Sequence, residues 1–143
     1  MPIVSTGADH DVGRRQMPQI PQEQLAEYMR WLRLNDVQAT VSTVPAKLLH
    51  PVQDHVDQQK VERMQEDLDT IRKQFIVVSD GYYIIDGHHR WYVLHEADPG
   101  TPVRIVHVHL PVNDAVKLSN EFEGSYNAGI HEVLKLADLL KDR

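Results

Sequence analysis

The chain of 143 residues contains no cysteine and no long apolar run. Without cysteine it has no disulfide, no iron–sulfur cluster, no thiolate zinc site and no cysteine nucleophile. No apolar run approaches the ~20 residues that a membrane-spanning helix needs, and the opening MPIVSTGADHDVGRR lacks the apolar region of a signal peptide. The sequence therefore predicts neither membrane insertion nor secretion, and we expect a cytoplasmic protein or a component of an assembly formed there, such as a phage particle.

Positive charge is also scarce, because 15 Lys and Arg face 21 Asp and Glu, a formal net charge of −6. This balance excludes a wide basic surface for nucleic acid but leaves room for one compact, phosphate-sized site. The length fits one domain, and a chain of this size buries roughly 68–70% of its unfolded surface, enough for a core without disulfides.

Hydrophobic periodicity predicts an α+β fold with a small mixed sheet and packed helices. Residues 1–20 have no period and predict a flexible arm, and residues 21–36 predict a helix with Leu25, Tyr28, Met29 and Leu32 on one face. A core is expected over 37–111 and further helices over 112–143. Within 112–143 we expect Asn113 to cap a helix, and a last helix over 130–141 has apolar residues on more than one face, which predicts contact with a second copy or another protein.

Inside the core, the pattern predicts a strand over 37–45, a helix over 57–74 with Asp57 as its N-cap, and a strand over 101–111. FIVVS and YYIID flank Asp80-Gly81, which predicts a hairpin with a two-residue type I′ turn. A helix is expected from Gly87 to the Pro99-Gly100 stop.

The segment Asp86-Gly87-His88-His89-Arg90 stands where a strand passes into a helix. The first turn of a helix has unpaired N–H groups and partial positive charge, Gly87 permits close approach, and Arg90 provides a forked donor for phosphate. His88 and His89 can move protons near neutral pH, and Asp86 can hold a cation or act as a base. The alternative is that Asp86 only caps the helix and the histidines lie on the surface.

The run IVVSDGYYIIDGHHRWYVL, preceded by VSTVPAKLLHPVQ and KVERMQEDL, resembles the ParB/sulfiredoxin superfamily, and the DGHHRW version is most similar to small phage ParB-like nuclease-type proteins. The resemblance covers about 41–111. It implies a ParB/sulfiredoxin-like fold in which Gly87, His88, His89 and Arg90 cradle the phosphates of a nucleotide such as CTP, ATP or ADP, and Gln53 is a further nucleotide-binding residue. Sulfinic-acid repair is excluded because His88 replaces the sulfiredoxin cysteine, and the chain is too short and acidic for the additional domains of chromosome-partitioning ParB.

Three functions follow as hypotheses. The first is binding of nucleotide or nucleic-acid phosphate, extending to a nuclease in which Asp86 holds Mg²⁺ or Mn²⁺, His88 or His89 moves the proton and Arg90 stabilises phosphoryl charge. The second is an ADP- or ATP-dependent small-molecule kinase, against which Gln53 weighs unless Asp54 or Asp57 acts as the base. The third is a non-catalytic phage structural or accessory protein with the same fold.

Three further groups of residues were considered for function. His107 and His109 alternate on a predicted strand and so share a face, which suits a zinc, nickel or iron site, but no motif provides a third ligand and chance spacing explains the pair better. Trp91 and Tyr92 could stack on a base, although packing of Trp91 in the core is the more ordinary role. Arg14-Arg15 is interpreted as solvated.

Overall fold

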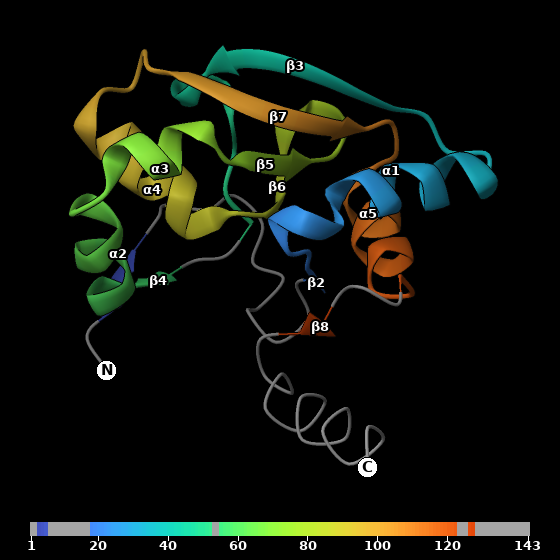
Figure 1. The fold of residues 1–143 in the computed structure, drawn as a ribbon, viewed down its shortest axis with the longest axis horizontal. Helices are drawn as coiled ribbons and strands as arrows, with labels where there is room; N and C mark the ends of the chain where they lie inside the picture. Colours follow the sequence, from blue (N-terminus) through green and yellow to red (C-terminus); the bar gives the residue numbers. More distant parts are fainter. Residues whose placement is uncertain (1–2, 6–17, 53–54, 123–125, 128–143) are drawn as a thin grey trace, which may run out of the picture.

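The computed structural model describes residues 3–5, 18–52, 55–122 and 126–127. At its centre lies a mixed four-stranded sheet, which confirms the predicted α+β class with a small mixed sheet (Figure 1). Its strands lie in the order β3 (Ala39–Pro45), β7 (Pro102–Val108), β5 (Phe75–Val78) and β6 (Ile84–Asp86). β7 is antiparallel to β3 and parallel to β5, whereas β5 and β6 form an antiparallel hairpin.

Helices cover both faces of the sheet, and this explains why β5 is apolar throughout. On one face lie α1 (Leu25–Leu34) and α5 (Val112–Ser119), and on the other lie α3 (Leu68–Lys73) and α4 (His88–Ala97). The two pairs stand on opposite sides of the view in Figure 1. α2 (Gln58–Gln65) packs beside α4.

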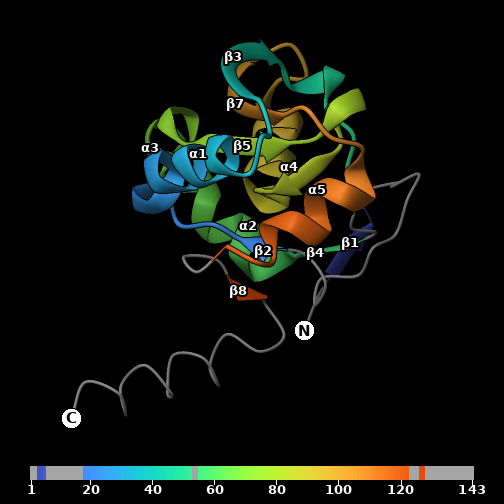
Figure 2. The same cartoon turned by 90° about the vertical axis from the view of Figure 1, so that its right-hand side faces the viewer.

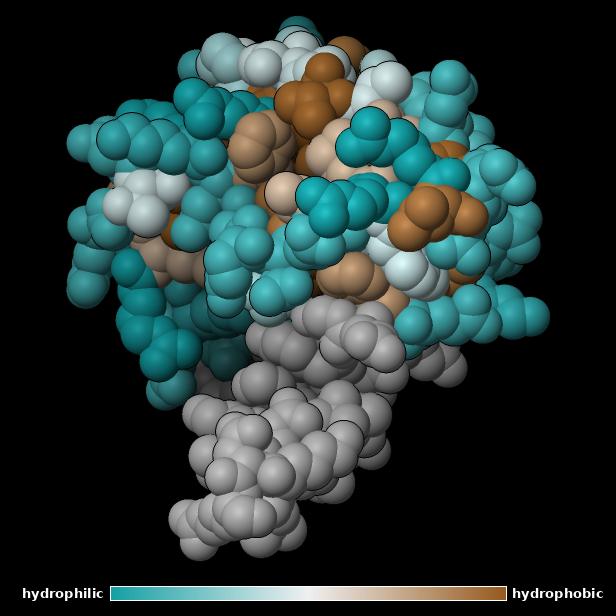
Figure 3. Space-filling model, turned by 45° about the vertical axis from the view of Figure 1, so that its right-hand side comes forward, coloured by the Kyte–Doolittle hydropathy of each residue, from teal (hydrophilic) through white to brown (hydrophobic). Residues whose placement is uncertain are grey.

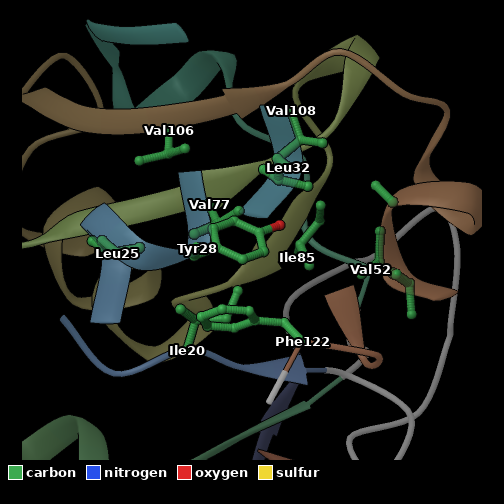
Figure 4. Close-up of a cluster of buried hydrophobic side chains, with 12 residues drawn as sticks. Ile20, Leu25, Tyr28, Leu32, Val52, Val77, Ile85, Val106, Val108 and Phe122 are labelled. Atoms are coloured by element: carbon green, nitrogen blue, oxygen red, sulfur yellow. The ribbon is translucent and has the colours of Figure 1, made fainter. Parts of the chain in front are cut away.

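Tyr28 is at the centre of the core cluster between α1, α5 and the sheet (Figure 4). Its ring is fully buried, packs edge-on against Phe122 at 5.4 Å, and lies beside Val77 and Ile85 of the sheet. Its hydroxyl reaches Ser119 Oγ on α5 at 2.6 Å, so the buried polar atom is satisfied. The predicted apolar face of this helix is therefore the buried one.

Two short strand pairs connect the chain ends to the body. β1 (Ile3–Ser5) pairs with β4 (His55–Asp57), and β2 (Pro18–Gln19) pairs with β8 (Tyr126–Asn127), both antiparallel. Sequence reasoning predicted none of these strands, because two- and three-residue strands have no readable period. In Figures 1 and 2, β2 and β8 lie far from the β3 edge of the sheet.

The helix predicted over 57–74 is two helices, so that prediction is wrong in extent. α2 ends before Glu66, and Asp67 begins α3 by accepting a hydrogen bond from the Thr70 amide at 3.4 Å. The predicted N-cap at Asp57 is confirmed, since its Oδ1 accepts from the Gln59 amide at 2.9 Å. Asp67 is a second capping residue inside a run whose apolar spacing continues, which is why periodicity alone missed the break.

The predicted type I′ turn at Asp80-Gly81 is also wrong in type. A 3-10 turn over Asp80–Tyr82 joins β5 to β6, and the positive φ angles belong to Gly81 (78°) and Tyr82 (60°) and not to Asp80. A type I′ turn needs positive φ at both central residues. The connection is longer than a two-residue turn: the Ser79 amide donates to the Tyr83 carbonyl at 2.9 Å, and the strand register shifts between Val77 and Val78.

Other boundaries differ by a few residues. The first helix opens with a 3-10 turn at Gln22–Gln24 before α1, and α5 begins at Val112 after Pro111, so Asn113 lies inside the helix and does not cap it. Pro suits this entry because the first helical amides have no partner within the helix. A 3-10 turn at Ala46–Leu48 follows β3.

Among the described residues, no helix has the length and apolar character needed to cross a bilayer. The face shown in Figure 3 is mostly hydrophilic, with separate apolar patches. The predictions for Arg14-Arg15, for Gln53 and Asp54, and for the helix over 130–141 with its homo-oligomer contact lie outside the described residues.

Candidate functional site: a pocket at the start of helix α4

Gly87 makes the junction between β6 and α4. Its backbone is left-handed, with φ 106° and ψ 25°, a conformation that residues other than glycine rarely adopt. A Cβ there would lie 2.9 Å from Arg90 Nη2 and 3.1 Å from Ile76 Cγ1. Both the backbone angle and the space therefore require glycine at the position where the sequence predicted a close approach.

Three side chains of α4 hold the connection that follows β3. His88 Nε2 accepts from the Val52 amide at 3.0 Å, and His89 Nε2 accepts from the Asp57 amide at 2.9 Å. Trp91 Nε1 donates to the Ala46 carbonyl at 3.0 Å. All three side chains are buried, so the surface alternative for the histidines is wrong and the core role of Trp91 is confirmed.

The same connection also runs beside the hairpin. His50 exchanges two backbone hydrogen bonds with it, from its amide to the Tyr82 carbonyl and from the Ile84 amide to its carbonyl, both at 2.8 Å. The edge strand β6 is thereby covered by the chain itself, which protects its unpaired backbone groups. The connection, the hairpin and the start of α4 therefore form one hydrogen-bonded unit around the Asp86–Arg90 segment.

His88 is neutral in this setting. Burial, followed by the neighbouring His89 and Arg90, lowers the pKa of His88 from 6.5 to about 3. Because its Nε2 accepts a backbone hydrogen bond, its proton resides on Nδ1. His88 thus contributes a fixed acceptor that aligns the connection, and its predicted role in proton transfer, like that of His89, stays a prediction.

Asp86 and Arg90 form the charged part of the junction. Asp86 is 5% exposed, its Oδ2 accepts from the Ile20 amide at 2.9 Å, and it lies 3.8 Å from Arg90 Nη2. Burial raises the pKa of Asp86, while Arg90, the Ile20 amide and Lys60 act in the opposite direction. The alternative in which Asp86 only caps the helix is not observed, since Gly87 occupies the N-cap and no side chain of the described residues caps it.

Arg90 has buried donors without acceptors. Its side chain is 15% exposed, and no described residue accepts a hydrogen bond from its Nε or Nη2. Nε and Nη2 lie along one edge of the guanidinium, the edge that binds two oxygens of a phosphate or carboxylate side by side. Unsatisfied buried donors are costly and call for a ligand or another acceptor.

A small pocket, partly open to solvent, lies at this junction. Its lining comes from β2, α2, the end of β6 and the start of α4, and consists of Gln19, Lys60, Met64, Asp86, Gly87, His88, His89 and Arg90. Lys60 and Arg90 are the cations of this lining and Asp86 is its carboxylate. With the N-terminal end of α4 added, the pocket has a net positive character suited to one anionic group.

Sequence reasoning found part of this set. It identified the Asp86–Arg90 segment but missed Gln19, Lys60 and Met64, and the mixed charges of the helix that contains Lys60 indicated only a solvated surface. Of the residues considered as a kinase base, Asp57 is the N-cap of α2 and is 8% exposed, and Gln53 and Asp54 are not described. Nothing in the linear pattern brings Gln19 or Lys60 to Arg90.

Comparisons of the chain with known protein families, with curated proteins and with solved structures find no match. The proposed function therefore rests on the pocket.

Proposed function

We propose that this protein binds the phosphate group of a nucleotide or of a nucleic acid in the pocket at the start of α4. The first turn of the helix, Arg90 and Lys60 supply positive charge, and Gly87, which has no side chain of its own, lets the Arg90 guanidinium lie close to the backbone. A phosphate is the anion that combines these needs, because it accepts both backbone amides at a helix start and a forked guanidinium.

The observation that carries the proposal is the unsatisfied edge of Arg90. Two adjacent donors are buried and lack an acceptor among the described residues, while the nearest carboxylate oxygen, on Asp86, is 3.8 Å from Nη2. Asp86 is already engaged by the Ile20 amide and so is held back from a close bidentate pair. Because the edge is buried without ligand, we expect Arg90 to change its side-chain rotamer when phosphate binds.

The resemblance to the ParB/sulfiredoxin superfamily supports the same proposal. The described order of β3, connection, α2 and α3, hairpin, α4 and β7 agrees with the order that the resemblance implies. We propose a ParB/sulfiredoxin-like fold on this basis. The segment Gly87–Arg90, which the resemblance assigns to phosphates, is also the segment that lines the pocket.

The test is a thermal-shift and calorimetric titration of the full chain with CTP, ATP, ADP and inorganic phosphate, each with and without Mg²⁺. Binding to the native state raises stability by RT ln(1 + [L]/Kd), about 2.7 kcal/mol at a ligand concentration of about 100 Kd. We expect Arg90→Gln to remove this shift and Lys60→Ala to weaken it. Arg72→Gln is the matched control, because Arg72 is a half-exposed arginine on α3 that forms an ion pair with Asp69 at 3.6 Å.

Two results would refute the proposal. One is that neither phosphate nor any of the nucleotides stabilises the protein. The other is that Arg90→Gln and Arg72→Gln bind phosphate with the same affinity, which would mean that Arg90 only pairs with Asp86. Arg90→Gln must remain folded by circular dichroism, and Arg90→Lys serves as a second variant that keeps the charge but loses the fork.

Strand cleavage is a further prediction at the same pocket. Mg²⁺ is commonly held by one or two carboxylates together with substrate phosphates, and among the described lining residues Asp86 is the only carboxylate. Nicking of a plasmid with Mg²⁺ or Mn²⁺ that disappears in Asp86→Asn and in Arg90→Gln would support a nuclease. The kinase and the phage accessory function stay predictions, each without an observation that favours it.

A further inference from the structure

Three potential metal ligands gather at the end of the sheet beyond β7 and beside the turn between β5 and β6. They are Asp80, His107 and His109, and one ligand atom from each lies within 4.8 Å of the other two. His107 Nε2 is 2.9 Å from Asp80 Oδ1, and His109 Nδ1 is 3.7 Å from the same oxygen. The two imidazole rings stack at 4.1 Å between centroids.

The backbone around each ligand is held by hydrogen bonds. Val78, at the end of β5, pairs with His107 on β7, which places the turn containing Asp80 beside the end of β7. The Asp80 amide then donates to the Leu110 carbonyl at 2.9 Å. The His109 amide donates to the Gln38 carbonyl, also at 2.9 Å. The carboxylate and the imidazoles are therefore brought together by the sheet and not by a loose loop.

The separations suit a single ion. Metal–ligand distances of 2.0–2.1 Å place two ligand atoms about 3.3 Å apart in a tetrahedron and about 2.9 Å apart at adjacent positions of an octahedron. The 2.9 Å between His107 Nε2 and Asp80 Oδ1 is at the lower end of this range, and the 3.7 Å between His109 Nδ1 and Asp80 Oδ1 lies above it. Small rotations of the His109 ring and of the Asp80 side chain, which is half exposed, bring all three atoms within reach of one ion.

Thr40 gives one histidine an outer partner. Its Oγ1 lies 3.0 Å from His109 Nε2, so the outer nitrogen of this ring has a hydrogen-bond partner while Nδ1 faces Asp80. Histidine ligands in proteins have this second hydrogen bond in nearly all cases, because it fixes the ring orientation and the tautomer. The histidine side chains are 18% and 35% exposed, so an ion and its water ligands can enter.

We propose that Asp80, His107 and His109 bind a divalent transition-metal ion of the zinc, cobalt, nickel or iron(II) class. Two imidazoles and one carboxylate favour these ions over Mg²⁺, which prefers oxygen ligands alone. Three protein ligands leave further coordination positions for water or a substrate. The site shares no residue with the phosphate pocket, and its existence does not depend on the proposed function.

The experiment titrates the full chain, first stripped with a chelator, with Zn²⁺ by calorimetry and with Co²⁺ by visible absorption. The variants are Asp80→Asn, His107→Ala and His109→Ala. His50→Ala is the matched control, because His50 is an exposed histidine outside the cluster and the chain has nine histidines that could bind an ion weakly. The Co²⁺ spectrum adds a readout that a purely structural hydrogen-bonded cluster would not produce.

We expect the parent and His50→Ala to bind one Zn²⁺ per chain. With Co²⁺, both should show the visible absorption band of a Co²⁺ ion with a low coordination number. Loss of either histidine should weaken binding by more than about 100-fold, and Thr40→Val by about 10-fold, the range seen for outer partners. Mg²⁺ should not compete. Unfolding curves recorded in chelator establish that each variant is folded before metal is added.

Two outcomes would overturn the proposal. The first is absence of saturable Zn²⁺ and Co²⁺ binding at sub-millimolar concentration, which would leave His107 and Asp80 as a simple hydrogen-bonded pair. The second is binding whose affinity is the same in His107→Ala, His109→Ala and His50→Ala, which would place the ion on other histidines of the chain. Asp80→Asn serves as a further ligand variant that keeps the size of the side chain, at a position whose side chain is half exposed.

Discussion

Acid should destabilise this protein through His88, and the replacement His88→Gln isolates the effect. Glutamine places Oε1 near the position of histidine Nε2, so the variant can still accept the hydrogen bond from the Val52 amide. It cannot take up a proton. Any difference in the pH dependence of stability between the two proteins therefore reports the titration of His88.

The magnitude follows from the pKa shift. The pKa of His88 is lowered from 6.5 to about 3, so below pH 6.5 the unfolded chain binds a proton that the folded protein does not. Stability is thus complete above the unfolded pKa and is lost as the pH falls toward the folded one. Linkage predicts a loss of about 2 kcal/mol between about pH 7.5 and about pH 5, with a slope approaching about 1.4 kcal/mol per pH unit.

Asp86 acts in the opposite direction and must be separated from this effect. Burial raises the pKa of Asp86, so its ionisation destabilises the folded state as the pH rises through that raised value. This contribution is present in both proteins. It therefore cancels when the unfolding free energy of His88→Gln is subtracted from that of the parent. The unfolding free energy of either protein alone still contains it.

The assay is urea unfolding of both proteins at half-unit steps of pH, followed by circular dichroism. We expect the free-energy difference between the parent and His88→Gln to shift by about 2 kcal/mol in favour of the variant from about pH 7.5 to about pH 5. His50→Gln, at an exposed histidine, should show no such shift. A constant difference between parent and His88→Gln across this range would refute the buried, neutral assignment of His88.

Three further predictions concern the core and the junction. Tyr28→Phe removes the 2.6 Å hydrogen bond to Ser119 and should lower the urea-unfolding free energy by about 1 kcal/mol; an unchanged value would mean the bond contributes nothing net. Gly87→Ala must adopt a φ of 106° and should cost more than about 1 kcal/mol and abolish phosphate binding, so a melting temperature equal to the parent's would contradict the geometry. Leu32→Ala, at a fully buried side chain, should cost about 2–5 kcal/mol, and Leu34→Ala, at 78% exposure, less than about 0.5 kcal/mol; equal losses would contradict the burial of α1.

The sequence predicted the elements whose signal is long or chemically specific. The apolar spacing of Leu25, Tyr28 and Leu32 marks a helical face because one face of α1 is buried. Asp57 reads as an N-cap because its short carboxylate can accept from amides two and three residues ahead. The strand over 37–45 was recognisable by its β-branched residues, and β3 lies within it.

Predictions from local sequence failed where contacts between residues distant in sequence determine the structure. Asp80-Gly81 favours a type I′ turn in isolation, but the hydrogen bond from the Asp80 amide to the Leu110 carbonyl and the bulge in the hairpin impose another turn. The break between α2 and α3 lies within a continuous apolar pattern. The strands β1 and β2 depend on partners far along the chain, so no local pattern announces them.

The sequence alone identified Asp86–Arg90 as the candidate site, because glycine between a strand and a helix and an arginine in the first turn have a local physical meaning. Only the tertiary structure divided the roles within it. It turns His88 and His89 toward backbone amides of a connection more than thirty residues away, and it leaves two donors of Arg90 without an acceptor among the described residues. Only the sheet register, likewise, brought Asp80 to His107 and His109. Side-chain identity is local, whereas the partner that satisfies a buried donor or acceptor is chosen by the packing of elements distant in sequence.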